Sequence, residues 1–230
     1  DYKVTGVQTC ALPIWGTAYV TLAVATYVAF APDFSEYVGA CGELARPEDS
    51  ARVMVPLGPQ SSGRTAIEVL DPLCPACAGF EDRLTASGLA PQLSRKALLF
   101  PLDSACNWMV SSAIHPGACT VSEAILCAGD QAEAVLAWAF EHQEAVRTAT
   151  AADADAAARM VKEAFPAIAT CLGSDKVRQR LNRSLRWAVA NELPVLTPQL
   201  YVDGRKLCDE DTDLGMDWAL PRLLSLRASR

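Results

Sequence analysis

The sequence predicts an α/β domain in which a small sheet is interrupted by a long helical insertion. Short apolar segments occupy residues 52–58, 65–72 and 95–103, the second of them containing β-branched residues, and the motif "CPAC" begins a helix after the second. An alanine-rich stretch with helical spacing then covers about residues 103–191, before a hairpin pattern and a terminal helix. With 230 residues, the chain is long enough to bury one sizeable core.

Composition restricts the class of protein. The formal net charge is −7 and the pI is about 4.9, and Lys and Arg do not gather into the basic face that a nucleic-acid-binding protein needs. We therefore expect no nucleic-acid partner. Nine cysteines are many for a cytosolic protein of this length, and seven lie outside the CPAC motif. This excess indicates an oxidising, extracytoplasmic compartment.

The first residues are set apart from the fold. The string "VTGVQTCALPI" (Val4 to Ile14) is what a sequencing adapter encodes when it is read as protein. We interpret residues 1–14 as an assembly artefact that stands in place of the natural N-terminus, and we exclude them from fold prediction. Cys10 then leaves the count, and eight cysteines remain.

A membrane span is predicted directly after this segment. Residues 15–31 carry no charge and no proline, and their length of 17 residues is at the lower edge of the roughly 17–25 that a span requires. Trp15 and Tyr37 are candidate interfacial anchors, and the acidic flank places the following domain on the non-cytoplasmic side. A buried core helix and a signal-peptide remnant are the competing interpretations. Residues 32–51 have no clear period and predict a linker or a short packed strap.

The elements of the domain, residues 52–228, follow in chain order. "RVMVPLG" (52–58) predicts a strand, "PQSSGR" a turn, "TAIEVLDP" (65–72) a second strand and "RKALLFPLD" (95–103) a third. Helical spacing recurs through the insertion, and Ser174 and Asp175 are expected to cap its last helix. "PQLYVDGRKLCDE" predicts a hairpin that turns at Asp203 and Gly204.

The cysteine pair of CPAC carries the chemistry. Cys74, placed just before a helix, has its sulfur near unpaired backbone N–H groups and the positive end of the helix dipole, which favour a thiolate. Pro75 suits the first helical position, where its missing N–H costs nothing. Cys77 lies one turn later on the same face, within disulfide reach. We therefore expect Cys74 to attack a partner disulfide and Cys77 to resolve the mixed disulfide.

Two other interpretations of the pair remain open. A zinc site would need a second pair of ligands, but the sequence has no other CxxC, and its two histidines, His115 and His142, stand alone. No metal is therefore expected. A purely structural disulfide is the other alternative, although a CxxC between a strand and a helix is a redox signal.

The order of elements, "CPAC" after a strand, the helical insertion and "VLTPQLYVDG" near the end resemble thioredoxin-fold proteins of the DsbA-like type, over roughly residues 52–228. The resemblance implies that Pro198 is a cis-proline facing the cysteine pair and that the backbone of Thr197 pairs with an extended substrate. An ordinary trans proline at a strand start is the alternative. Pro75 joins these two residues as a candidate substrate contact.

The family also keeps a buried acid six residues before the attacking cysteine, and Glu68 matches that position. The resemblance implies that Glu68 lies under the helix and accepts the proton of Cys77, a role that a raised pKa would suit. A glutamate facing water is the alternative. The dipeptide between the cysteines departs from the family, because strongly oxidising members often have a histidine there. The direction of electron flow is therefore open.

The remaining cysteines resemble those of DsbA-like domains fused to, or found beside, vitamin K epoxide reductase homologues. That resemblance implies the pairs Cys106–Cys119 and Cys127–Cys171. Cys41 and Cys208 are left over as a third pair, although eight cysteines permit 105 connectivities. A second redox relay through Cys106 and Cys119 is the alternative to a structural role. The expected membrane partner is a quinone-linked vitamin K epoxide reductase homologue.

Together these features predict an extracytoplasmic thiol-disulfide oxidoreductase, anchored in the cell membrane through residues 15–31, that acts on protein thiols and disulfides without an organic cofactor. A reductase or isomerase using the same residues is the enzymatic alternative. A thioredoxin-like binding module whose Cys74–Cys77 bond never turns over is the non-enzymatic one. His115 is expected to order a loop rather than touch a thiolate.

Overall fold

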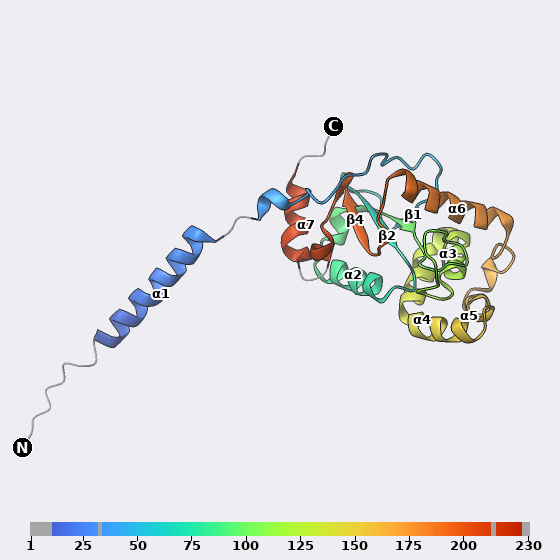
Figure 1. Ribbon diagram of the computed structural model, residues 1–230, viewed down its shortest axis with the longest axis horizontal. Coiled ribbons are helices and arrows are strands. Elements are labelled where there is room, and N and C mark those ends of the chain that lie inside the picture. Colours follow the sequence, from blue (N-terminus) through green and yellow to red (C-terminus); the bar gives the residue numbers. More distant parts are fainter. Residues whose placement is uncertain (1–10, 32–33, 213–214, 227–230) are drawn as a thin grey trace, which may run out of the picture. The chain divides into compact units, whose positions relative to one another are not determined.

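The computed structural model describes residues 11–31, 34–212 and 215–226 of the chain (Figure 1). These residues belong to two compact units, Asp1–Glu36 and Tyr37–Arg230.

The first unit contains helix α1, Ala11–Phe30. Its large described side chains are apolar. No helix within the described ranges combines the length and the apolar character needed to cross a bilayer, so the span predicted over residues 15–31 is not confirmed. Residues 1–10 of the adapter-like segment (residues 1–14) lie outside the described residues.

The second unit is built on a five-stranded sheet in the order β1-β3-β2-β4-β5. Its strands are β1 Val55–Leu57, β2 Thr65–Leu70, β3 Ser94–Leu99, β4 Gln199–Val202 and β5 Arg205–Lys206. Strands β2 and β3 are parallel and are joined through helix α2, Pro75–Ala86, whereas β1, β4 and β5 pair antiparallel with their neighbours. All the predicted strands are therefore present, with small shifts at their ends.

The two faces of the sheet have separate cores because side chains alternate along a strand. On one face, Ala66 of β2 packs with side chains of α2 and of α7, Met216–Ser225. On the other face, Ile67 and Val69 pack with side chains of α6, Asp175–Ala190. Glu68 shares the face of Ala66, which puts it on the α2 side of the sheet as predicted.

The helical insertion contains α3 Ala118–Cys127, α4 Ala132–Ala152, α5 Ala156–Ala164 and α6. Its first helix begins at Ala118, because residues 103–117 form the loop that contains His115. Gly117 ends this loop: its φ is +93° at the N-cap of α3, a left-handed conformation that glycine adopts readily. At the N-cap of α6, the Ser174 hydroxyl accepts the backbone N–H of Val177, as the sequence predicts.

Short 3-10 turns complete the fold: η1 Ser35–Tyr37, η2 Ala90–Gln92, η3 Gly129–Gln131, η4 Pro166–Ile168 and η5 Asp209–Thr212.

The segment predicted as a linker packs along the edge of the sheet. The backbone N–H of Lys206 donates to the Gly42 carbonyl and that of Leu44 donates to the Gly204 carbonyl, both at 2.8 Å. The Leu44 side chain is buried. This part of residues 32–51 therefore forms a packed strap, one of the two alternatives predicted from the sequence.

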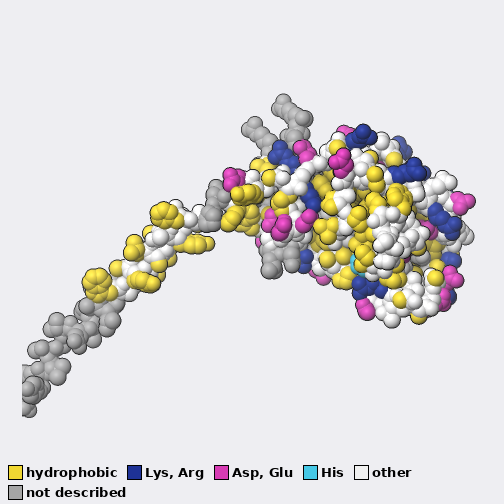
Figure 2. Space-filling view, viewed as in Figure 1, with side chains coloured by type: hydrophobic (Ala, Val, Ile, Leu, Met, Phe, Trp, Pro, Cys, Tyr) yellow, Lys and Arg dark blue, Asp and Glu magenta, His cyan; other side chains and the backbone are white. Residues whose placement is uncertain are grey.

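Figure 2 shows one face of the larger unit, on which Lys and Arg side chains are interspersed with Asp and Glu. Hydrophobic side chains are also visible over much of this face. The visible charges therefore do not form a single basic patch.

Candidate thiol site

The turn that carries Cys74 connects β2 to α2. Cys74 is the N-cap of α2, with extended backbone at φ −82° and ψ 119°, and Pro75 is the first residue of the helix. The Cys74 carbonyl accepts the N–H of Cys77 at 3.0 Å and that of Ala78 at 3.2 Å, so the first helical turn is closed around it. Both Cys74 and Cys77 are free thiols and both are buried. The geometry is therefore that of the reduced pair.

The two sulfurs differ in acidity. A hydrogen bond from the Cys77 thiol lowers the pKa of Cys74 to about 6, against the effect of burial, and Thr197 and His115 add to the decrease. Burial raises the pKa of Cys77 well above its ordinary value, and the neighbouring Cys74 charge raises it further. Cys74 is consequently the thiolate of the pair, and Cys77 holds its proton.

The segment before β4 faces these sulfurs. The peptide bond between Thr197 and Pro198 is cis, and Sγ of Cys74 lies 3.7 Å from the carbonyl oxygen of Thr197. The Thr197 side chain also lowers the pKa of both thiols. Thr197 and Pro198, far from the CPAC motif in sequence, thus lie beside it in the structure.

Glu68 is buried on the α2 side of the sheet, but its carboxylate engages another residue. Arg95 of β3 donates to it through Nε at 2.5 Å and through Nη2 at 3.0 Å. Burial raises the pKa of Glu68, and the hydrogen bonds and charge of Arg95 oppose that rise. Within the described residues, the hydrogen bonds of this carboxylate go to Arg95 and none goes to Cys77.

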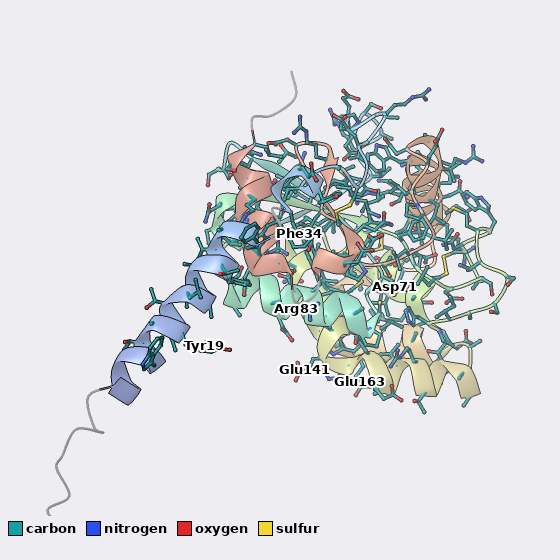
Figure 3. The ribbon with its side chains drawn as sticks, turned by 60° about the vertical axis from the view of Figure 1, so that its left-hand side comes forward. Tyr19, Phe34, Asp71, Arg83, Glu141 and Glu163 are labelled. Atoms are coloured by element: carbon teal, nitrogen blue, oxygen red, sulfur yellow. A yellow bond between two sulfur atoms is a disulfide. The ribbon has the colours of Figure 1, made fainter. Side chains whose placement is uncertain are left out.

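Three further residues at the site were not identified as functional from the sequence. Gln143 of α4 donates through Nε2 to the Cys74 carbonyl at 2.8 Å, so a hydrogen bond links the helical insertion to the turn that carries Cys74. Asp71, labelled in Figure 3, follows β2 and is fully buried. Its Oδ2 lies 2.8 Å from Nδ1 of His115. No periodic signal marks these residues, because each acts through a contact with a distant part of the chain.

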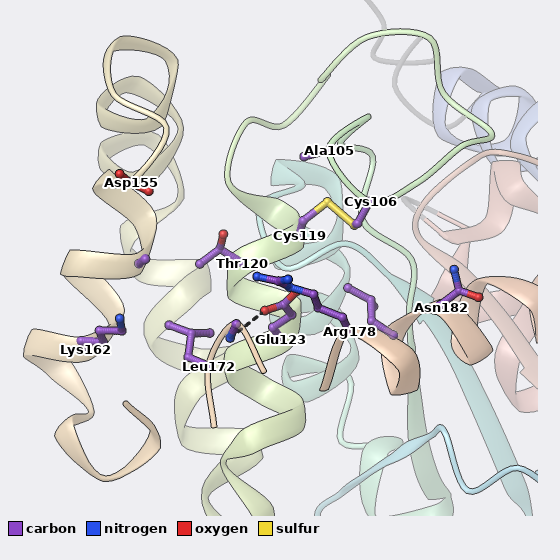
Figure 4. Close-up of a pocket in the computed structure, with 13 residues that line it drawn as sticks. Ala105, Cys106, Cys119, Thr120, Glu123, Asp155, Lys162, Leu172, Arg178 and Asn182 are labelled. Atoms are coloured by element: carbon purple, nitrogen blue, oxygen red, sulfur yellow. Dashed lines mark hydrogen bonds and ion pairs between the residues drawn. A yellow bond between two sulfur atoms is a disulfide. The ribbon is translucent and has the colours of Figure 1, made fainter. Parts of the chain in front are cut away.

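In the described part of the chain, the six cysteines other than Cys74 and Cys77 form disulfides. Cys41 is bonded to Cys208, Cys106 to Cys119 and Cys127 to Cys171, which are the pairs expected from the sequence. Cys106–Cys119 lines a cavity of about 430 Å³ bordered by α3, α5 and α6 (Figure 4). Glu123 and Arg178 line the same cavity, and burial raises the pKa of Glu123. No group of His, Cys, Asp or Glu suited to hold a metal ion is present in the part of the chain that the structure describes.

Comparison with known proteins identifies the fold. No protein-family model and no curated protein sequence matches the chain. Solved structures do match. The oxidoreductase DsbA from Xylella fastidiosa is 18% identical, with a TM-score of 0.51, and the match covers 75% of this chain and 93% of that one.

Two further structures have the same fold. The protein-disulfide isomerase from Novosphingobium aromaticivorans is 16% identical, with a TM-score of 0.52 and coverage of 74% and 97% of the two chains. The catalytic domain of ScsC from Proteus mirabilis is 18% identical, with a TM-score of 0.50 and coverage of 75% and 90%. The chain therefore has the mixed α/β, thioredoxin-like fold of DsbA-like proteins.

Proposed function

We propose that this protein is a thiol-disulfide oxidoreductase that exchanges disulfides with protein substrates through Cys74 and Cys77. The observation that supports this most strongly is that the pKa of Cys74 is lowered and the pKa of Cys77 is raised. Both thiols lie at the start of α2, beside the cis Thr197–Pro198 bond. A stable thiolate next to a buried, protonated thiol suits a nucleophile with a resolving partner. The fold shared with oxidoreductases and disulfide isomerases supports the same conclusion.

The exchange transfers two electrons from a substrate dithiol to the Cys74–Cys77 disulfide. A substrate thiolate attacks Cys74 Sγ, and Cys77 leaves and takes up a proton because its pKa is high. A second substrate thiolate then attacks the substrate sulfur of the mixed disulfide and releases Cys74 as a thiolate, a good leaving group at a pKa of about 6. The substrate gains a disulfide, and the protein is left with two reduced cysteines.

Exposed apolar side chains beside the thiol pair support polypeptide substrates. Val195 and Leu196 precede Thr197, and Ile114 precedes His115; their exposed fractions are 46%, 41% and 57%. Large exposed apolar groups around a reactive sulfur suit the side chains of an unfolded chain. The backbone before Pro198 offers hydrogen bonds to an extended peptide, and Pro75 borders the nucleophile.

Glu68 is proposed as the acceptor of the Cys77 proton during resolution, when Cys77 attacks the mixed disulfide at Cys74. Its burial, its raised pKa and its place on the α2 side of the sheet support the role. Its ion pair with Arg95 supports a second, structural role, since the same carboxylate holds β2 to β3. The two roles are separated by a kinetic test described in the Discussion.

We further propose an extracytoplasmic, periplasmic location with anchoring through residues 15–31. Three disulfides in one domain support an oxidising compartment. Re-oxidation of the Cys74–Cys77 pair is then assigned to a quinone-linked membrane partner of the vitamin K epoxide reductase type. No organic cofactor is required, because the sulfur pair carries the electrons.

The reduction potential of the Cys74–Cys77 pair tests the proposal. The full chain is equilibrated against glutathione buffers, and the reduced fraction is read after acid quenching and alkylation. A potential toward about −120 mV supports a disulfide donor, whereas one near about −270 mV supports the reductase alternative. A pair that does not exchange at all leaves the binding-module alternative.

A further inference from the structure

The residues between the two cysteines bring no positive charge to the nucleophile. Pro75 and Ala76 have apolar side chains, and the first turn of α2 holds no basic residue. The positive charge nearest in sequence on α2 is Arg83, in its last turn. A side chain that stabilises the Cys74 thiolate by its charge must therefore come from another element.

His115 comes from the loop between β3 and α3 and is held by Asp71. Its Nδ1 lies 2.8 Å from Asp71 Oδ2, and both residues are buried. Asp71 in turn belongs to the nucleophile's turn: its carbonyl accepts the Cys74 N–H at 3.1 Å and its Oδ1 accepts the Leu73 N–H at 2.7 Å. One residue thus closes the turn of the nucleophile and orients the imidazole.

The backbone fixes His115 from both sides. Its N–H donates to the Leu102 carbonyl at 3.1 Å, and its carbonyl accepts the Ala118 N–H at 3.1 Å, where α3 begins. The Cys106–Cys119 disulfide closes the loop that contains it. The imidazole is therefore pre-positioned in the folded protein.

The charges around His115 favour its protonated form. Burial lowers the pKa of His115, but the hydrogen bond and charge of Asp71 and the charge of Cys74 raise it above the ordinary value. Arg147 of α4 opposes them and is itself paired with Glu144 at 2.6 Å. The interaction between His115 and Cys74 is mutual, because His115 also lowers the pKa of Cys74.

We propose that His115, oriented by Asp71, is the positioning residue whose positive charge stabilises the Cys74 thiolate and so favours the reduced form of the pair. This inference rests on the proposed function and assigns its direction: the protein oxidises substrate dithiols. When a substrate reduces the disulfide, the negative charge left on Cys74 is balanced by the imidazolium, and the proton of the exchange resides on Cys77. The stabilisation is present while His115 is protonated and is lost as pH rises through the pKa of His115.

Substitution of the two histidines tests the role. His115→Gln removes the charge, and His142→Gln is the matched control, because His142 lies on α4 with Nδ1 at 2.8 Å from the Trp138 carbonyl. The measurements are the titration of the Cys74 thiolate by ultraviolet absorbance and the equilibrium constant with glutathione at pH 6. We expect His115→Gln to raise the pKa of Cys74 and to shift the equilibrium constant at pH 6 about twofold toward the oxidised protein, the change that a rise of one unit from a pKa of about 6 gives at this pH.

The control and a charged replacement complete the set. His142→Gln is expected to keep both wild-type values, and His115→Lys to recover most of the lost stabilisation. A folded His115→Gln protein with wild-type thiolate titration and equilibrium constant would overturn the inference. If wild-type Cys74 fails to exchange with glutathione, the proposed function fails instead.

A reciprocal measurement on the unsubstituted protein avoids any effect of mutation on folding. Linkage requires that the Cys74 thiolate raises the pKa of His115 as much as His115 lowers that of Cys74. NMR titration of the His115 ring should therefore give a higher pKa in the reduced protein than in the oxidised one. Equal values for His115 in the two forms would overturn the inference.

Discussion

Arg95 donates two hydrogen bonds to the buried carboxylate of Glu68, from Nε at 2.5 Å and from Nη2 at 3.0 Å. The same guanidinium also contacts Glu81 of α2. The ion pair therefore links the two parallel strands at the centre of the sheet and joins them to the helix that carries the cysteines. Glu68 can therefore contribute to the stability of the fold through Arg95 and to proton transfer at Cys77, and different substitutions test the two contributions.

Removing one partner of this ion pair should destabilise the fold. Arg95→Met leaves the Glu68 carboxylate buried without compensation, for which we expect a loss of about 3–5 kcal/mol in the free energy of unfolding at neutral pH. The loss should shrink as pH falls through the raised pKa of Glu68, because the protonated carboxyl carries no unpaired charge. Urea unfolding of the oxidised protein measures it. The double variant Glu68→Leu/Arg95→Met should regain much of the loss, and strictly additive effects would contradict a coupled pair.

Glu68→Gln distinguishes proton transfer from a structural role. If Glu68 accepts the proton of Cys77, the amide should slow resolution of a preformed mixed disulfide at Cys74 by about 10²-fold or more. Stopped-flow release of a chromogenic thiol from Cys74 follows that step. Glu81→Gln is the matched control, since Glu81 contacts the same arginine at a more exposed position. Unchanged kinetics in Glu68→Gln would leave Glu68 as the structural partner of Arg95 only.

The acidity of Cys74 should depend most on Cys77. The rate of alkylation by iodoacetamide should rise with a midpoint near pH 6 in the reduced protein, in line with the lowered pKa of Cys74. Cys77→Ala should move this midpoint upward, because the hydrogen bond from Cys77 is the largest cause of the decrease. Thr197→Val should move it in the same direction by less. A larger effect of Thr197→Val than of Cys77→Ala would contradict this order.

The two disulfides on α3 should differ in how readily they are reduced. Cys119 is the second residue of α3 and Cys127 is its last, so the helix dipole stabilises a thiolate at Cys119 and destabilises one at Cys127. Cys106–Cys119 also borders the cavity of about 430 Å³. We expect dithiothreitol to open Cys106–Cys119 before Cys127–Cys171 in the native protein, as read by timed alkylation and mass spectrometry.

A control in urea isolates the cause of this difference. With α3 unfolded, the dipole is lost, and the two disulfides should open at similar rates. Earlier opening of Cys127–Cys171 in the native protein would contradict the argument from the helix ends.

Much of the site was accessible from the sequence because its signals are local. The strand before CPAC, Pro75 at the first helical position and the hairpin after Pro198 each depend on neighbours within a few residues, and the structure has each element where it was expected. The loop that contains His115 also follows a local signal, because Pro116 and Gly117 disfavour helix directly before α3.

The sequence by itself determined where the two cysteines of CPAC lie, at the start of the helix that follows a strand. Tertiary structure decided what surrounds them: Glu68 pairs with Arg95 at a separation of 27 residues, Asp71 holds His115 across 44, and Gln143 reaches the Cys74 carbonyl across 69. Helix caps, turns and strand periodicity arise from backbone geometry that acts over one or two turns of chain. The partner of a buried polar group, by contrast, depends on which distant segments the packing of the core brings against it.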